Sequence, residues 1–325
     1  MNYRLFANTG WKVSEIGLGT WQLGSDWGNV EESVAWRILA EAVDHGVNFF
    51  DTADVYGAGK SESRIGKFLK SRHGRIFVAT KLGRLKGFPN RYSRQLIRQC
   101  TEDSLRRLGV DAVDLSQLHC VPPKALKEGN VFDWLRELRT EGKIKAFGAS
   151  VESMDEALVC LEQEGLASLQ IIFNLFRQKP IEALFAKAAA KKVSLIIRLP
   201  LASGLLSGRI TKSTTFSQGD HRNYNRDGKA FNVGETFAGL GFERGVEMAE
   251  KLKEFVPTGM DMAVFAQRWI LDYPEVTVII PGATRVEQVA SNASAGDLSP
   301  LSQDLHERLG SFYEREVKGY IRGPY

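Results

Sequence analysis

The sequence predicts a (β/α)8 barrel with a β-hairpin in front of it and a long loop after the seventh strand. Eight short apolar runs, rich in branched or aromatic residues, alternate with amphipathic segments, as buried parallel strands alternate with helices. Most consecutive runs recur every few tens of residues, which is the length that a strand, its crossover helix and two loops require. The chain has 325 residues, and such barrels usually need roughly 250 before insertions. We therefore expect residues 1–325 to form one barrel domain.

The expected elements follow from this alternation in chain order. A hairpin of residues 3–6 and 12–15 flanks Asn8-Thr9-Gly10, because glycine can adopt positive φ in the turn. It is expected to cap the barrel floor. Amphipathic periodicity predicts helices that include residues 34–44, 92–108 and 181–191. The eight strands are expected at residues 16–18, 47–50, 76–80, 112–118, 144–149, 168–173, 193–199 and 276–280.

Residues 203–242 make the step from the seventh strand to the eighth much longer than the others. The segment is rich in glycine, serine, threonine and asparagine, and a loop of this length is usually functional or disordered. Its aromatic residues offer apolar anchors, which favour partial order. We interpret the segment as a lid over the site, anchored by Phe216, Tyr224, Phe231 and Phe237.

Composition excludes several classes of protein. Lysine and arginine number 43 against 39 acidic residues, a formal net charge of +4, and the cations are too dispersed for a nucleic-acid surface. The sequence lacks an apolar stretch of about 18 residues and an N-terminal signal segment, so we expect no membrane partner and a cytoplasmic location. Cys100, Cys120 and Cys160 lack the short spacing of metal ligands, which predicts reduced thiols and no metal site.

Four polar residues fall where an expected strand gives way to a loop. Asp51 and Tyr56 follow the second strand, Lys81 the third and His119 the fourth. Catalytic groups of such barrels lie at the carboxyl ends of the strands. One strand-end Asp or His is more often a capping or hydrogen-bonding residue. Four on one face, with a proton donor and a cation among them, are hard to explain by structure alone and predict an active site.

Their chemistry follows from what Tyr56 needs to act as an acid. A phenol has a pKa near 10, so it holds its proton at neutral pH and donates it only if a nearby cation stabilises the phenolate. Lys81 supplies the cation, Asp51 keeps it charged, and a neutral His119 orients a carbonyl oxygen by a hydrogen bond. This set suits protonation of an alkoxide. Hydride makes an alkoxide from a carbonyl, which implies a nicotinamide partner.

Several segments carry a family pattern, namely FDTADVYG at 50–57, TKLG at 80–83 and residues 105–109 and 113–119, with further agreement at 17–21, 147–150, 200–209 and 280–285. Together they resemble the aldo-keto reductase superfamily, of the bacterial NADP-dependent type, over nearly the whole chain. The resemblance implies NADP(H) bound in an extended form across the barrel mouth. It also implies reduction of an aldehyde or ketone to the alcohol, with Tyr56 as general acid and the four residues above as the catalytic tetrad.

The resemblance also carries cofactor and substrate residues onto this chain. Ser150 and Gln170 match positions that hold the carboxamide, and residues 201–207 match the loop over the pyrophosphate, although composition alone explains that segment equally well as a flexible loop. Trp21, Tyr56 and His119 are the expected substrate contacts. The expected cofactor contacts are Thr20, Trp21, Asp51, Ser150, Gln170, Arg198, Leu201, Ser203, Gly204, Ser207, Arg209, Gly282, Thr284, Arg285, Gln288 and Asn292.

The preference for NADP over NAD rests on two arginines. Arg285, with Arg209 as a second cation, is expected to pair with a 2′-phosphate; either can instead be a solvated surface charge. Gln288 and Asn292 lie on one face of the helix that begins near Arg285 and are expected to grip the adenosine.

Three positions depart from the commonest family pattern. Val151 stands where many members have Asn, and Cys120 where Trp is frequent, which removes a bulky wall from the pocket. Arg198 replaces a stacking Tyr. A guanidinium group is planar and can also stack, and we expect its charge to disfavour the oxidised nicotinamide relative to the reduced one.

The sequence leaves the substrate class and the direction of the reaction open. Trp21, Val55, Trp27 and the loop aromatics indicate an apolar pocket for a small carbonyl compound, with Trp27 equally suited to the core. Cations of the loops, namely Arg84, Lys86 and Arg222, either recruit an anionic substrate or face solvent. One alternative is an NAD(P)-dependent alcohol or sugar dehydrogenase that uses the same tetrad in the oxidative direction. Another is a cofactor-sensing regulatory subunit of a membrane channel. The sequence alone chooses neither the physiological substrate nor the oligomeric state.

Overall fold

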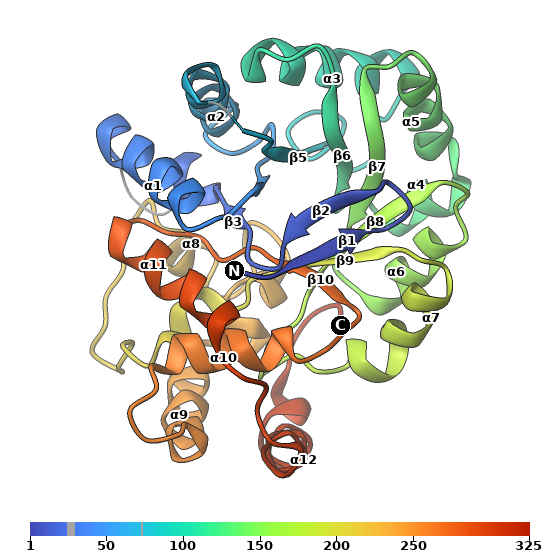
Figure 1. The fold of residues 1–325 in the computed structure, drawn as a ribbon. Helices are drawn as coiled ribbons and strands as arrows, with labels where there is room; N and C mark the ends of the chain where they lie inside the picture. The colour runs from blue at the N-terminus through green and yellow to red at the C-terminus, as the bar shows by residue number, and fades with distance from the viewer. Residues whose placement is uncertain (25–29, 73) are drawn as a thin grey trace.

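Eight parallel strands form a barrel in the computed structural model, which describes residues 1–24, 30–72 and 74–325. Each strand pairs with the next along the chain, and bridges from Ile16 to Ile279 and from Gly19 to Gly282 join the last strand to the first. The predicted barrel is confirmed (Figure 1). Its strands are β3 (Leu18–Gly19), β4 (Phe49–Asp51), β5 (Phe77–Leu82), β6 (Val113–His119), β7 (Ile144–Ser150), β8 (Leu166–Ile172), β9 (Ser194–Arg198) and β10 (Val276–Ile279).

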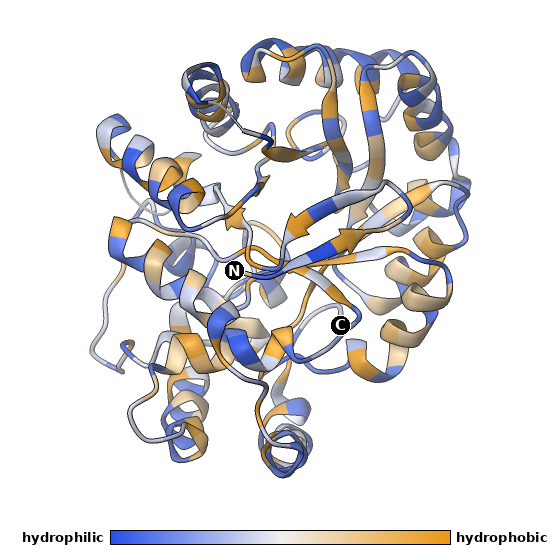
Figure 2. Cartoon of the chain, in the orientation of Figure 1, coloured by the Kyte–Doolittle hydropathy of each residue, from blue (hydrophilic) through white to orange (hydrophobic). Residues whose placement is uncertain are grey.

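Helices cover the outside of the barrel, and Figure 2 shows apolar and polar residues on different faces of the longer ones. The predicted helix at 92–108 begins two residues later than expected, because the Ser93 side chain caps it by accepting from the Leu96 N–H. It ends at Leu108 as expected, where Gly109 with φ of 67° caps it. The predicted helix at 181–191 opens with a π-helical turn, η2 (Ile181–Phe185). The α-helices are α1 (Glu32–Asp44), α2 (Lys60–Ser71), α3 (Arg94–Leu108), α4 (Pro123–Glu128), α5 (Asn130–Thr140), α6 (Met154–Leu161), α7 (Ala186–Ala190), α8 (His221–Tyr224), α9 (Phe242–Leu252), α10 (Met262–Leu271), α11 (Val286–Ser294) and α12 (Gln303–Phe312).

The N-terminal hairpin closes one end of the barrel, as predicted (Figure 1). It consists of β1 (Tyr3–Phe6) and β2 (Trp11–Ser14), paired antiparallel. Phe6 stacks on Phe49 with ring centroids 5.7 Å apart, and Trp11 stacks on Phe77 at 5.1 Å. Phe49 and Phe77 are the first residues of β4 and β5. The hairpin therefore covers the amino ends of the strands and leaves the carboxyl ends for a site.

The barrel closes tightly where β3 meets β10. A Cβ atom on Gly19 would lie 2.6 Å from the carbonyl oxygen of Ile280, a distance that real side chains do not tolerate. The Gly19 N–H instead donates to Pro281 O at 3.0 Å. Glycine at this position lets the first and last strands approach.

The long segment between β9 and α9 is folded against the barrel through short helical turns. These turns are η3 (Ala202–Ser207), α8, η4 (Val233–Glu235) and η5 (Phe237–Gly239). Phe237 is fully buried and packs on Phe216 and Phe242, with ring centroids 5.8 and 5.2 Å away. Two of the aromatic residues predicted as anchors, Phe216 and Phe237, thus pack together here. In the part of the chain that the structure describes, no helix is long and apolar enough to span a membrane.

Candidate active site

A cavity of about 420 Å³ lies at the carboxyl ends of the barrel strands. Strand ends form its floor, and residues of the long segment after β9 form part of its wall. Most of the residues predicted from the sequence line it: Thr20, Trp21, Asp51, Tyr56, His119, Gln170, Arg198, Leu201, Ser203, Gly204, Ser207, Gly282, Thr284 and Gln288.

Lys81 links the phenol of Tyr56 to the carboxylate of Asp51. Asp51 is the last residue of β4 and Lys81 lies near the end of the neighbouring β5, so both side chains reach the same end of the barrel. The buried Lys81 ammonium group donates to Asp51 Oδ1, to Thr52 O at 2.9 Å and to the Tyr56 hydroxyl at 3.2 Å. The predicted contact between acid and cation is therefore present in the geometry.

The surroundings keep Lys81 charged and Tyr56 protonated. Burial pushes the pKa of Lys81 down, but Asp51 and then Tyr56 outweigh that effect and raise it above its ordinary value. Burial raises the pKa of Tyr56; Lys81 opposes this rise and Asp51 adds to it. At neutral pH the site thus holds an ammonium group beside a neutral phenol, the state that a proton donor requires.

Two glutamines hold the second oxygen of Asp51. Gln170 Nε2 donates to Asp51 Oδ2 at 2.8 Å, and Gln117 Nε2 donates to the same atom at 3.3 Å. Gln117 was not predicted, although it stands two residues before His119 on β6 and therefore points to the same side of the strand. Both amides fix the carboxylate, so Asp51 keeps one orientation toward Lys81.

His119 ends β6 and faces the phenol. Its ring centroid lies 5.9 Å from that of Tyr56, with the planes at 88°. Burial, followed by the positive charges of Arg84, Lys81 and Arg198, lowers the pKa of His119 well below its ordinary value. The imidazole is therefore neutral and carries one N–H that can be donated to a ligand oxygen.

Trp21 forms the wall beside Tyr56. Its ring stacks on that of Tyr56 at 5.9 Å and contacts the ring of His221 at 4.7 Å. Phe231 meets Trp21 edge-on at 6.1 Å. Val55 lines the same cavity. These contacts give the mouth an apolar side where the sequence predicts one; Trp27, predicted with them, lies outside the described residues.

The segment predicted to cover a pyrophosphate makes a tight turn beside the cavity. Ala202, Ser203 and Gly204 have φ of 48°, 59° and 96°, so three consecutive residues are left-handed. Ser203 Oγ is already engaged, because it donates to Glu235 O and accepts from the Phe237 N–H. Ser207 Oγ donates to Gly204 O at 2.6 Å. The side chains of Ser203 and Ser207 thus stabilise the turn, which lines the cavity.

The start of α11 offers a second polar edge. Gln288 Oε1 accepts from the Thr284 N–H at 2.8 Å and from Thr284 Oγ1 at 3.2 Å. Arg285 is the exposed N-cap residue of α11. The Gln288 side chain therefore orders the turn that precedes the helix.

Four predicted cofactor residues lie outside the cavity lining. Arg209 and Arg285 are exposed, and Arg209 Nη2 lies 3.6 Å from Asp261 Oδ2. Asn292 is buried and accepts from Gln267 Nε2 at 3.0 Å. Ser150 is buried at the end of β7, and its Oγ is without a hydrogen-bond partner among the described residues. Ser150 pairs in register with both His119 and Gln170, which do line the cavity.

A buried carboxylate from the long segment joins the site, and the sequence did not predict it. Glu235 Oε1 lies 3.1 Å from Arg84 Nη1 and 3.2 Å from Arg198 Nη1. Burial alone would raise the pKa of Glu235, but Arg84 and Arg198 lower it to about 2. Arg198 also donates to Val151 O at 3.0 Å. Arg198, whose charge is expected from the sequence to disfavour the oxidised nicotinamide, is therefore ion-paired with Glu235.

The three loop cations considered from the sequence have different surroundings. Arg84 faces the cavity with its side chain 18% exposed, whereas Lys86 is exposed and lies 3.4 Å from Asp103. Arg222 lines the cavity and pairs with Asp220 at 2.6 Å. Arg84 and Arg222 thus line the cavity, whereas Lys86 is not among its lining residues.

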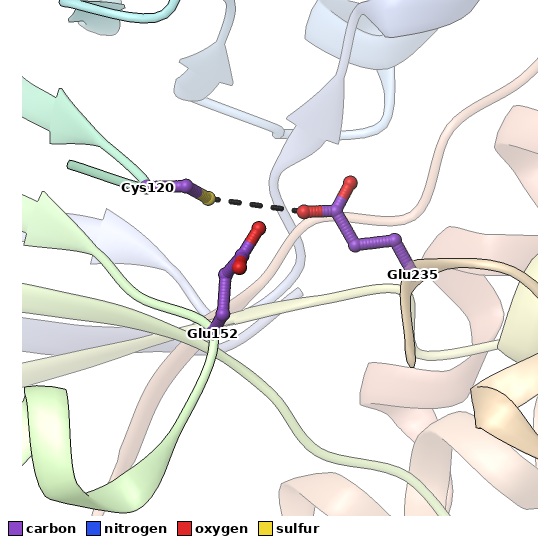
Figure 3. A group of neighbouring side chains, drawn as sticks. All are labelled: Cys120, Glu152 and Glu235. Atoms are coloured by element: carbon purple, nitrogen blue, oxygen red, sulfur yellow. Dashed lines mark hydrogen bonds between the residues drawn. The ribbon is translucent and has the colours of Figure 1, made fainter. Parts of the chain in front are cut away.

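Cys120 and Glu152 lie beside Glu235, with one ligand atom of each within 4.8 Å of the others (Figure 3). Burial, more than any neighbouring charge, raises the pKa of Cys120 to about 12, so its thiol stays protonated. The guanidinium groups of Arg84 and Arg198 occupy Glu235 Oε1 and repel a cation. These charges favour an ion-pair network over a metal site at this position.

Comparison with known proteins agrees with the fold. The fold is a (β/α)8 barrel with a cavity at the carboxyl ends of its strands, and the family that it matches is one of oxidoreductases. The sequence profile of the Aldo/keto reductase family matches residues 15–314, and the chain belongs to that family.

Three relatives illustrate the similarity. Aldo-keto reductase YhdN of Bacillus subtilis is 30% identical, over 98% of this chain and 92% of its own length. The solved glycerol dehydrogenase AKR11B4 of Gluconobacter oxydans is 28% identical with a TM-score of 0.80, over 100% of this chain and 98% of that one. The holo form of aldo-keto reductase AKR11C1 of Bacillus halodurans is 26% identical with a TM-score of 0.78, over 99% and 98%.

Proposed function

We propose that this protein uses NADPH to reduce an aldehyde or ketone to the alcohol, with Tyr56 as the general acid. The observation that carries the proposal is the contact of Lys81 Nζ with both Asp51 and the Tyr56 hydroxyl at the floor of a cavity. A neutral His119 faces the same phenol. Together these groups can bind a carbonyl oxygen, orient it and protonate it.

Each residue has a separate task in this reaction. NADPH, when bound, supplies the hydride. The N–H of His119 orients the carbonyl oxygen toward the phenol, and Tyr56 transfers its proton to that oxygen as negative charge develops on it. Lys81 stabilises the phenolate that remains, and Asp51, fixed by Gln117 and Gln170, keeps Lys81 charged and in place.

The residues present fit a nicotinamide cofactor. The buried Ser150 Oγ, unpartnered among the described residues, lies between His119 and Gln170 in the sheet register, where the resemblance expects it to bind the carboxamide. The left-handed turn at residues 202–204 presents backbone beside the cavity, where phosphates can approach. Exposed Arg285, next to Thr284 in the cavity wall, supports binding of a 2′-phosphate.

Absorbance at 340 nm with NADPH or NADH and a panel of short aldehydes and ketones tests the proposal. We expect oxidation of NADPH in the presence of a carbonyl compound, with lower catalytic efficiency for NADH.

Arg285→Gln should raise the Kd for NADPH and leave the Kd for NADH unchanged. Arg315→Gln, which removes an exposed cation of the C-terminal helical turn, is the control. A protein that binds NADPH but turns over no carbonyl, and oxidises no alcohol with NADP, would contradict the proposal.

A dehydrogenase working in the oxidative direction is the second candidate. The similar structure of a glycerol dehydrogenase favours it, and the same residues serve both directions, with the Tyr56 phenolate as base. Because the pKa of Tyr56 is raised, oxidation should accelerate toward alkaline pH while reduction does not. Comparing rates of carbonyl reduction and polyol oxidation at neutral pH distinguishes the two candidates.

A further inference from the structure

The cavity wall beyond Tyr56 and His119 is built from two guanidinium groups and one carboxylate. Arg84 extends from the end of β5, Arg198 ends β9, and Glu235 comes from η4 of the long segment. Within the described residues, Arg84, Arg198 and Cys120 all contact Glu235 Oε1. Figure 3 shows the second carboxylate oxygen turned away from Cys120 and Glu152. Oε2 is thus left for a ligand in the cavity that Glu235 lines.

Glu235 is held in place by its backbone. Its carbonyl oxygen accepts from Ser203 Oγ at 3.1 Å, and its N–H donates to Asn232 O at 3.0 Å. The next residue, Thr236, is fully buried and accepts from Asn225 Nδ2 through Oγ1 at 3.0 Å. The backbone of Glu235 is therefore fixed, and Arg84 and Arg198 hold its carboxylate in the wall of the cavity.

This carboxylate decides what the two arginines can recognise. Two guanidinium groups facing one cavity form a receptor for a substrate carboxylate when nothing else pairs with them. Here the carboxylate of Glu235 already pairs with both guanidinium groups. Glu235 cancels one of the two positive charges, and a substrate carboxylate between the arginines would lie beside Glu235 as a like charge. Its binding is therefore weaker than at two unpaired arginines, and such repulsion is a common source of specificity.

The same wall suits hydroxyl groups. Oε2 of Glu235 can accept a hydrogen bond from a substrate hydroxyl, and the remaining N–H groups of Arg84 can donate to the oxygen of such a hydroxyl. Trp21 and Phe231 add apolar faces on the other side. Polar and apolar groups are thus placed for a small neutral molecule with hydroxyl groups.

We propose that Glu235 weakens the attraction of Arg84 and Arg198 for a carboxylate, so that the cavity prefers neutral, hydroxylated carbonyl compounds to those that carry a carboxylate. This inference rests on the proposed reductase activity. It assigns to Glu235 the role of a specificity-determining residue, which touches the substrate but takes no part in the proton transfer.

The test compares matched substrates in the wild type and in Glu235→Gln. Glyceraldehyde and propanal differ by hydroxyl groups, while 4-oxobutanoate and pentanal are of similar length and differ by charge. In Glu235→Gln we expect kcat/KM for 4-oxobutanoate relative to pentanal to rise by about tenfold or more. The ratio for glyceraldehyde over propanal should fall by about tenfold, because a hydrogen bond to a charged acceptor is lost.

Control measurements separate selectivity from misfolding. Glu243→Gln removes an exposed carboxylate in the first turn of α9 and should leave both ratios unchanged. The Kd for NADPH, followed by fluorescence, confirms that the variants are folded. Glu235→Asp keeps the charge and should retain the wild-type preference against 4-oxobutanoate.

Two outcomes of this test separate a failure of the reductase activity from a failure of the role of Glu235. If the wild type reduces none of the four compounds, the proposed reductase activity fails. If it reduces them and Glu235→Gln keeps both wild-type ratios, the activity stands and the role of Glu235 is wrong.

Discussion

Lys81 is a fully buried cation, and the proposed proton transfer explains its surroundings better than a contribution to stability does. Taking an ammonium group and a carboxylate out of water costs several kcal/mol each, so a buried ion pair contributes little net stability. The pair of Lys81 and Asp51 is nevertheless completed by Thr52 O, Gln117 and Gln170. Such a satisfied network holds Lys81 at the Tyr56 hydroxyl, and this is the position that general-acid chemistry requires.

Asp54, three residues after Asp51, makes stability depend on pH. It is buried, and burial followed by the neighbouring Glu62 raises its pKa to about 7. Because the folded-state pKa is raised, its stabilising contribution is complete at low pH, below the pKa of the unfolded chain, and is lost as pH rises through about 7.

Asp54→Asn mimics the protonated acid and should remove this dependence. We expect the variant to gain stability relative to the wild type between acid pH and about pH 8, by at most ~4 kcal/mol, since one pKa unit corresponds to about 1.4 kcal/mol. Urea unfolding at a series of pH values measures the difference. A wild type and variant whose stabilities run parallel over this range would show that Asp54 is not protonated in the folded state.

The sequence predicts some of these residues and not others for a physical reason. Asp51, Lys81 and His119 stand at the ends of apolar runs, and parallel strands bring their carboxyl ends together, so local pattern is enough. Glu235 lies in a segment whose path depends on contacts with Ser203 and distant parts of the chain. Its pairing with Arg84 and Arg198 therefore appears only in the folded structure.

Arg177 joins the segment that carries Glu235 to the C-terminal residues of the chain. Arg177 is fully buried; Nη2 donates to Pro324 O at 2.8 Å and Nη1 to Ala238 O at 3.5 Å. Its guanidinium carbon lies 4.1 Å from the centre of the Tyr325 ring. The C-terminal residues and the turn η5 are thus tied to one side chain, which supports the wall of the cavity from behind.

Arg177→Met keeps much of the apolar stem and removes these hydrogen bonds. We expect a loss of roughly 3 kcal/mol, because each bond to a charged donor contributes about 1.5–3 kcal/mol, together with faster proteolysis within residues 203–242. Lys187→Met, which removes an exposed cation on α7, is the control. Equal cleavage rates for both variants and the wild type would show that Arg177 does not stabilise the segment.

For the molecule as a whole, the hairpin and the cavity lie at opposite ends of the barrel. The hairpin packs Phe6 and Val13 into a cluster with inward-facing residues such as Phe49, Leu115 and Ile196. The cavity lies at the carboxyl ends of the same strands. The sequence predicts this arrangement well, because eight repeated strand and helix patterns leave few other folds, whereas the helix ends depend on caps such as Ser93.

Phe6→Ala should therefore destabilise the barrel without changing its chemistry. Removing a fully buried phenylalanine costs about 3–5 kcal/mol, while kcat measured well below the unfolding temperature should stay near the wild-type value. Leu5→Ala, at a neighbouring position that is 64% exposed, should change stability by less than ~0.5 kcal/mol. Urea unfolding measures the free energy of unfolding of both variants. Equal losses for the two substitutions would contradict the role of the hairpin in closing the barrel.

The central claim is that Tyr56 donates the proton, and Tyr56→Phe tests it most directly. The measurement is kcat for carbonyl reduction at 340 nm, together with the Kd for NADPH by fluorescence. We predict a fall in kcat of about 10²–10⁴-fold, the usual contribution of a general acid, with the Kd for NADPH unchanged, because Phe keeps the ring that stacks on Trp21. A Tyr56→Phe variant that binds NADPH and reduces carbonyl compounds at nearly the wild-type rate would contradict the account.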